Sequence, residues 1–114
     1  MRETIEIAKD FSSYLVNRNP RQGDGSNNGE GFREKFLSHL DPDWWKSDNI
    51  ITFDFSGVRT LGPSWANEVF AYYTDTYERK LILKKFLFKN ISPVKLEIIH
   101  LEIESGYKTS LIAK

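Results

Sequence analysis

Short apolar runs along the chain predict three strands. Residues 4–9 alternate between polar and apolar side chains, and this period of two is typical of a strand with one buried face. The run over 50–55 is apolar enough to predict a central strand of a sheet. Residues 86–90 are equally dense in apolar side chains, and we expect them to form its neighbour or near neighbour.

Apolar residues at helical spacing predict two amphipathic helices in the middle of the chain. The first runs over 29–40, with charged residues on its other side, and ends at Asp41-Pro42-Asp43. The second runs over 63–77, because proline suits a first helical turn, where its missing N–H costs nothing. Its apolar face is wide, so we expect it to lie against a sheet.

A third helix is predicted over 93–105, with Ser92 as its N-cap and Gly106 as its C-terminal stop. Five residues are expected to face inward: Val94, Ile98, Ile99, Leu101 and Ile103. The alternation of apolar residues over 96–103 leaves a strand as an alternative here. The order β, long loop, α, β, α, β, α predicts the α/β class, a mixed or partly parallel sheet with helices packed on it.

Turn-forming residues dominate 17–29, which predicts a long flexible surface loop with almost no apolar anchor. A loop of this length in a small domain is often functional. Asp24, Ser26 and Asn28 imitate the first half of a calcium-binding loop, but Lys35 stands where the bidentate glutamate should be. No metal site is therefore expected.

Composition indicates one globular domain over residues 1–114. The chain has 114 residues, 39% of them hydrophobic and 28% charged, which is ordinary globular usage. There is no cysteine, so a reducing compartment fits and thiolate chemistry is excluded. The N-terminus has no apolar leader, and no run approaches the roughly 20 apolar residues of a membrane span. We expect a cytoplasmic protein.

The charge balance argues against a nucleic acid or an anionic membrane as partner, because the 16 basic and 16 acidic residues cancel. The densest basic stretch, over 79–89, is interpreted as solvated residues that protect a neighbouring strand from aggregation. Trp44 and Trp45 cannot both face inward if their segment is extended, so one is a candidate exposed binding anchor. The alternative is that both pack at the edge of the core.

No catalytic set is evident in the sequence. His39 and His100 lie outside any ligand-spaced motif. Ser64 has Gly62 two residues before it but lacks the second glycine, two residues after it, that a nucleophile elbow needs. We therefore expect a protein that is not an enzyme and carries no cofactor.

Several blocks, in order, resemble the STAS-like domain family, relatives of the bacterial anti-sigma-factor antagonists. Residues 51–58 (ITFDFSGV) are similar to the family's strand of apolar residue, Asp, Phe, x, Gly, Val, and 63–68 (PSWANE) to its helix start Pro-Ser-Phe-x-x-Glu. Residues 28–35 (NGEGFREK) are similar to its Gly-Glu-x-Phe-Arg helix, and 7–12 (IAKDFS) extend the resemblance toward the N-terminus. The resemblance implies a regulatory module that binds a protein partner.

In the antagonists, a serine at the start of the helix after the central strand is phosphorylated by a histidine-kinase-like ATPase, and phosphorylation releases that partner. Ser64 matches this serine by position, although the chain has Gly62-Pro63-Ser64-Trp65 where the antagonists carry Asp-Ser-Ser-Gly. Without phosphorylation, Ser64 would be only a helix cap.

The partner-binding residues that the resemblance implies lie between the central strand and the following helix: Ser56, Gly57, Arg59, Gly62, Pro63, Ser64, Trp65, Asn67 and Glu68. An alternative function is a small nucleotide- or ligand-binding domain that uses the 17–29 loop.

Overall fold

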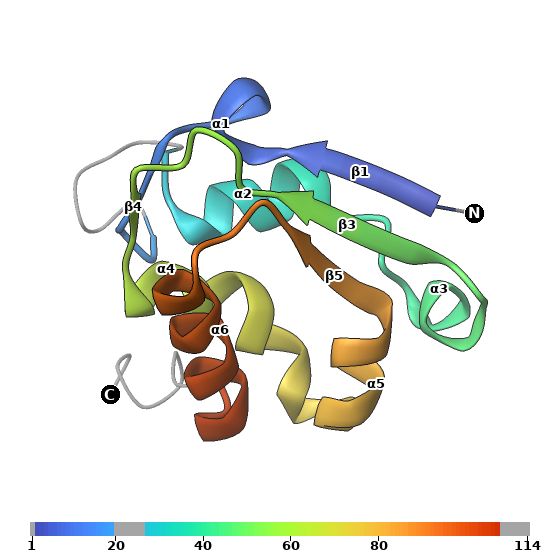
Figure 1. The fold of residues 1–114 in the computed structure, drawn as a ribbon. Helices are drawn as coiled ribbons and strands as arrows, with labels where there is room; N and C mark the ends of the chain where they lie inside the picture. Colours follow the sequence, from blue (N-terminus) through green and yellow to red (C-terminus); the bar gives the residue numbers. More distant parts are fainter. Residues whose placement is uncertain (1, 20–26, 108–114) are drawn as a thin grey trace.

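A computed structural model describes residues 2–19 and 27–107 of the chain (Figure 1). Its main sheet has the order β1-β3-β5, and both neighbouring pairs are parallel. The strands are β1 (Arg2–Glu6), β3 (Ile50–Asp54) and β5 (Phe86–Lys89). The predictions of a central strand at 50–55 and of a neighbour at 86–90 are therefore confirmed.

The two faces of this sheet differ in burial. Ile5 lies in register with Phe53, and Phe53 with Phe88, and the side chains in this row are buried or half-buried. The next row alternates to the other face, where Thr4 and Leu87 are exposed. Successive side chains of a strand point to opposite faces, so the helices cover one face of the sheet.

The first strand ends earlier than the alternation over 4–9 predicts. The carbonyl of Ile7 accepts hydrogen bonds from the amides of Phe11 and Ser12, which closes a turn of the short helix α1 (Ile7–Asp10). Strand pairing therefore stops at Glu6.

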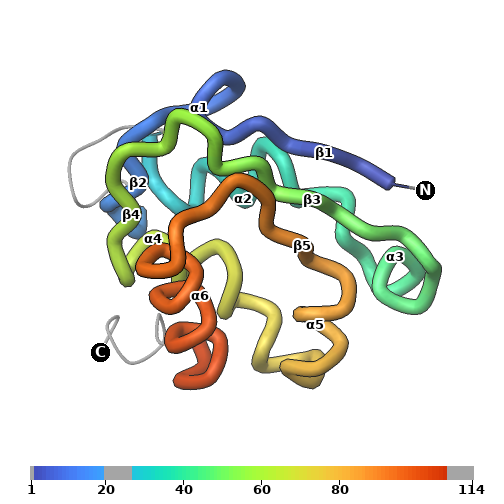
Figure 2. The backbone as a smooth tube through the Cα atoms, viewed as in Figure 1, coloured from blue at the N-terminus to red at the C-terminus, as the bar shows by residue number. Residues whose placement is uncertain are grey.

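A second, two-stranded parallel sheet joins β2 (Tyr14–Leu15) to β4 (Thr60–Leu61), and the sequence did not predict it. Strands this short carry no periodicity of their own. Figure 2 shows the two segments running side by side beside the start of helix α4. The amide of Gly62 donates to the carbonyl of Leu15 at 2.7 Å, so the hydrogen bonds between these two segments continue to Gly62, the residue immediately before α4.

The remaining helices follow the predicted order with different limits: α2 (Gly29–Phe36), α3 (Pro42–Lys46), α4 (Pro63–Phe70), α5 (Arg79–Lys85) and α6 (Pro93–Ser105). The helix predicted over 29–40 thus ends early, at Phe36. The helix predicted over 63–77 is α-helical only to Phe70 and continues as the 3₁₀ helix η2 (Ala71–Asp75). There the hydroxyl of Thr74 donates to the carbonyl of Ala71 at 2.7 Å.

Helix α3 decides between the two interpretations of the tryptophan pair, because both side chains pack in the core and neither is exposed. Asp41 accepts a hydrogen bond from the amide of Trp44 at 2.8 Å, and Pro42 follows as the first helical residue. The segment expected to end a helix therefore begins one, and its residues are not extended. Trp44 and Trp45 are both buried, and the ring of Trp45 stacks on Tyr77 at 4.4 Å.

Helix α5 was missed because its apolar residues are interleaved with lysines. Ile82 is buried against the core, while Lys80 and Lys84 are exposed as expected. Lys85, however, is only 4% exposed, so the interpretation of this stretch as solvated throughout is wrong at that residue.

The predicted limits of α6 are confirmed, and the strand alternative is wrong. Ser92 accepts from the amide of Lys95, and the positive φ of 84° at Gly106 ends the helix. Ile99 and Ile103, four residues apart, form the fully buried stripe. Val94 and Leu101 lie on the other side of this stripe and are 69% and 57% exposed, so they do not face inward as predicted.

The predicted 17–29 loop is anchored at both of its described ends. The amide of Gly29 donates to the carbonyl of Asn17 at 2.8 Å, and Arg18 and Asn19 are buried. Gly29 already belongs to α2, whose N-cap is the buried Asn28. These contacts hold the two described ends of the predicted loop in place, and 20–26 lie outside the described residues.

Candidate functional site

The nine residues predicted to bind a partner separate into exposed and buried groups. Four are exposed and two are partly exposed: Ser56, Gly57, Arg59, Pro63, Gly62 and Ser64. The other three are buried: Trp65, Asn67 and Glu68. Buried side chains do not reach a partner docked on this surface, so these three residues have another role.

Ser64 is the second residue of helix α4. The N-cap of this helix is Gly62, no side chain caps it, and Pro63 occupies the first helical position. Among the described residues, Ser64 makes no side-chain hydrogen bond, so its interpretation as a helix cap is wrong. The partly exposed hydroxyl therefore lies beside amide groups at a helix N-terminus, where an anion is favoured.

The turn after β3 places Ser56 and Gly57 at the carboxyl end of the central strand. Asp54 Oδ1 accepts from the amide of Ser56 at 2.9 Å and from Asn90 Nδ2 at 3.1 Å. These hydrogen bonds, chiefly that of the Ser56 amide, hold the pKa of Asp54 below its ordinary value of 3.8. Gly57 has a φ of 81°, a conformation that favours glycine. The turn is thus built by one ionised carboxylate and one glycine.

Strand β2 and the residue that follows it add two exposed residues that the sequence did not single out. Tyr14 and Val16 are 53% and 45% exposed, while Leu15 between them is fully buried. Arg59 lies beside them, because its guanidinium donates to the hydroxyl of Tyr14 at 3.5 Å. The only sequence signal was this outward, inward, outward alternation over three residues. We call the exposed surface of Tyr14, Val16, Arg59, Pro63 and Ser64 the β2–α4 patch.

One turn along α4 from Ser64 lies a buried cluster of polar side chains centred on Glu68, which is 2% exposed. Its carboxylate accepts from Arg33 at 2.5 Å and from the Tyr107 hydroxyl at 3.2 Å, and lies 3.6 Å from the guanidinium of Arg18. Arg18 also donates to Asn67 Oδ1 at 2.8 Å. These five residues form what we call the Glu68 cluster.

The Glu68 cluster joins four parts of the chain. Asn67 Nδ2 donates to the carbonyl of Gly106 at 2.8 Å, which ties α4 to the end of α6. Arg33 reaches Glu68 from α2, and its guanidinium lies 3.7 Å from the ring of Tyr72. Burial, the largest influence, lowers the pKa of Arg33, but the hydrogen bond and charge of Glu68 outweigh it, so the pKa is raised.

Close packing accompanies this charge pairing. A Cβ added to Gly29 would lie 2.8 Å from Cβ of Glu68. The backbone of α2 at Gly29 therefore packs directly against the Glu68 side chain of α4. The motif residues Arg33, which is half-buried, and Glu68, which is buried, thus hold α2 and α4 together. Trp65, fully buried against Phe32 at 5.0 Å, fills the space beside them.

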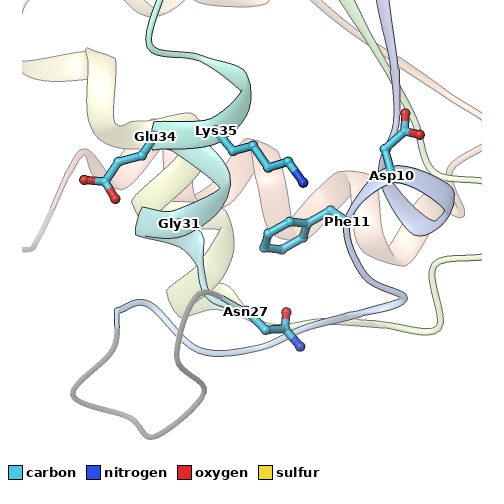
Figure 3. A pocket seen from close by; sticks show the side chains of 6 residues that line it. All are labelled: Asp10, Phe11, Asn27, Gly31, Glu34 and Lys35. Carbon is cyan, nitrogen blue, oxygen red and sulfur yellow. The ribbon is translucent and has the colours of Figure 1, made fainter.

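A cavity of about 430 Å³ lies beside the described end of the 17–29 loop. Figure 3 shows Phe11 between Asp10 and Asn27, with the Lys35 side chain extending toward it and Glu34 pointing away. In residues 2–19 and 27–107, no three His, Asp or Glu side chains gather in a way that would hold a metal ion. The lining of the cavity thus includes one cation, Lys35, two carboxylates, Asp10 and Glu34, and the aromatic ring of Phe11.

A parallel sheet with helices packed on one face, and a serine at the start of the helix that follows its central strand, are the features of this small α/β domain. A family model described as a STAS-like domain of unknown function (DUF4325) matches residues 29–96, more than half of the chain. The chain belongs to this family, and the resemblance seen in the sequence is confirmed. No curated protein and no solved structure matches this chain. None of the described helices has the length and apolar character needed to cross a membrane.

Proposed function

We propose that this chain is a non-enzymatic regulatory module that binds a protein partner through the β2–α4 patch, as anti-sigma-factor antagonists do. The observation that carries the proposal is that β2 and the start of α4 form one exposed surface. Tyrosine and arginine are enriched among the residues that dominate binding energy in protein interfaces, and the patch has one of each. The Glu68 cluster, one turn further along α4, supports a surface that keeps its shape on docking.

Ser64 is the proposed switch, and its proposed kinase is a histidine-kinase-like ATPase that also serves as the partner. The hydroxyl oxygen would attack the γ-phosphorus of ATP bound to the partner, losing its proton while ADP leaves. A phosphate at this position lies at the N-terminus of α4, where the helix dipole and free amides stabilise negative charge. The fold would tolerate the modification, whereas a docked partner would have to desolvate it.

The test uses the histidine-kinase-like ATPase encoded nearest to this chain, purified and titrated calorimetrically against the wild-type chain, Ser64→Ala and Ser64→Glu. We expect Ser64→Ala to bind within a fewfold of wild type. Ser64→Glu should bind at least a hundredfold more weakly, because an unpaired charge buried in an interface costs several kcal/mol. Equal affinities of the two variants would refute the switch. Mass spectrometry after incubation with ATP should place the phosphate on Ser64, and phosphorylation of Ser56 in its place would also refute it.

A matched pair of substitutions tests the patch independently of Ser64. Val16 in the patch and Leu83 on α5 are both apolar and 45% and 39% exposed. Val16→Ala should weaken partner binding severalfold, whereas Leu83→Ala should leave it unchanged. If both variants bind as wild type does, the partner docks elsewhere.

The second candidate function is binding of a nucleotide or another small ligand beside the 17–29 loop, and the cavity of about 430 Å³ favours it. Phe11 offers a surface on which a ring can stack, and Lys35 offers a cation for a phosphate. A nucleotide panel should then raise the melting temperature with increasing concentration, because a ligand that binds only the native state stabilises it. Lys35→Gln should abolish the shift, while Lys9→Gln, an exposed lysine outside the cavity, should retain it.

A further inference from the structure

A second cleft, of about 550 Å³, opens at the amino ends of the three parallel strands. Arg2 and Ile50 begin β1 and β3, Lys85 directly precedes β5, and all three residues line the cleft. The turn that carries Ser56 follows the opposite, carboxyl end of β3. The cleft is therefore separate from the surface proposed to bind a partner, and its volume lies within the range of small-molecule sites.

Positive charge dominates the lining of this cleft. Four cationic side chains contribute, from Arg2, Lys46, Lys84 and Lys85, against the single carboxylate of Asp48. The pairing of β1 with β3 and the packing of α3 and α5 bring them together, although the whole chain is neutral. A local excess of this kind favours an anionic ligand.

Lys85 is the cation that most needs a counter-charge. It is 4% exposed, it donates one hydrogen bond to the carbonyl of Ser47 at 2.6 Å, and its Nζ lies 4.6 Å from the ring of Trp44. Within 2–19 and 27–107, no carboxylate lies within 4.0 Å of its ammonium group. Burial lowers the pKa of Lys85, although the charge of Asp48 opposes this effect. A bound anion would relieve the cost of holding this ammonium group away from water.

Trp45 forms an aromatic wall of the same cleft. It lines the cleft and is 3% exposed, and its indole N–H donates to no acceptor in the described part of the chain. The indole nitrogen is itself inaccessible from the cleft, so Trp45 contributes apolar ring surface to the lining and not a hydrogen bond. Leu81 and Ile50 line the same cleft and add apolar surface.

We propose that this cleft binds a small phosphate monoester, whose dianion lies among Lys84, Lys85 and Arg2 and whose apolar body packs against Trp45 and Leu81. A dianion matches the excess of three positive charges over the single carboxylate better than a monoanion does. The site is independent of the proposed partner surface, because it shares no residue with the β2–α4 patch.

The test measures binding of three probes by calorimetry: phenyl phosphate, inorganic phosphate and phenol. We expect phenyl phosphate to bind most tightly and inorganic phosphate at least tenfold more weakly. Phenol should show no binding at about 10 mM, a concentration at which dissociation constants above about 1 mM are still detected. Absence of phenyl phosphate binding at that concentration would overturn the proposal.

Two lysines of the same helix provide the matched control. Lys84 lines the cleft and Lys80 does not, although both are exposed on α5. Lys84→Met should weaken phenyl phosphate binding about tenfold, and Lys80→Met should leave it within twofold of wild type. Equal losses would show attraction to surface charge alone and would overturn the site. Lys85→Met should abolish binding while retaining the circular dichroism of the native fold. Because Lys84 is exposed, the Lys84→Met result stands even if Lys85→Met fails to fold.

Discussion

Replacing Glu68 by glutamine tests whether the Glu68 cluster holds α2 and α4 together. Glutamine keeps the shape of the side chain and one acceptor oxygen, but it removes the charge that faces Arg18 and Arg33. It also turns an amide NH₂ toward groups that are themselves donors. Breaking a buried ion pair costs about 3–5 kcal/mol, and the retained oxygen favours the lower end, about 3 kcal/mol. This is a large share of the roughly 5–15 kcal/mol that stabilises a typical domain.

The assay is urea unfolding followed by far-ultraviolet circular dichroism, with Glu104→Gln as control. Glu104 is an exposed glutamate of α6, so its substitution should change the free energy of unfolding by less than about 0.5 kcal/mol. Glu68→Gln should lower that free energy by about 3 kcal/mol and the melting temperature by about 12 °C, at roughly 4 °C per kcal/mol.

A double-mutant cycle with Arg33→Met separates the ion pair from general packing. If Glu68 and Arg33 act as a unit, Glu68→Gln should cost about 1–3 kcal/mol less in the Arg33→Met background than in the wild-type chain. The reasoning is refuted if the two substitutions are additive, or if Glu68→Gln is as mild as Glu104→Gln.

Three further outcomes follow from single contacts. Gly29→Ala should destabilise the fold by about 1–3 kcal/mol, because the new methyl group would lie 2.8 Å from Glu68 Cβ. The control Gly31→Ala, at a residue that lines a cavity, should be neutral or stabilising in thermal melts. Asp54 has a lowered pKa in the folded state, so its contribution to stability is present above pH 3.8 and is lost as the pH falls below that value. Asp54→Asn should therefore flatten the dependence of the unfolding free energy on pH below about pH 4, measured by urea titration at each pH. Ser92→Ala removes the N-cap of α6 and should cost about 1 kcal/mol in the same urea titration.

The elements that the sequence predicted well are those whose signals are local and complete. Helix α6 has a capping serine, a proline at its first position and a terminal glycine, and its limits were predicted correctly. Strand β3 is a continuous apolar run, and its central place follows from that run. In both cases the residues of the element carry enough information without knowledge of their neighbours.

The missed elements depend on contacts between distant segments. Tyr14–Leu15 becomes a strand only because Thr60–Leu61 lies beside it, and neither pair has a period that can be recognised. Helix α3 was mistaken for a helix stop, since an aspartate followed by a proline can either end one helix or cap the next. The burial of Lys85 depends on the carbonyl of Ser47, which is 38 residues away.

The candidate site shows the same division. The resemblance identified the segment between β3 and α4, and the structure exposes its loop residues and Ser64. It did not show that Asn67 and Glu68 point inward, because a helical motif does not reveal which of its faces meets the sheet. Tyr14 was missed because it lies outside the blocks that carry the resemblance and reaches the site only through pairing of β2 with β4.

This division bears on what the family match can say about function. Arg33 and Glu68 both lie within residues 29–96, and the structure pairs them in the interior. A motif built on such a pair reports on how α2 packs against α4, so the match is informative about the fold. Under the proposed function, choice of partner depends instead on exposed side chains, and two of those in the β2–α4 patch, Tyr14 and Val16, precede the matched segment. Members of the family that share the Glu68 cluster but differ at these two positions should therefore fold alike and bind different partners. Exchanging the residues at positions 14 and 16 between two such members should exchange their partner preference. Neither melting temperature should change by more than a few degrees.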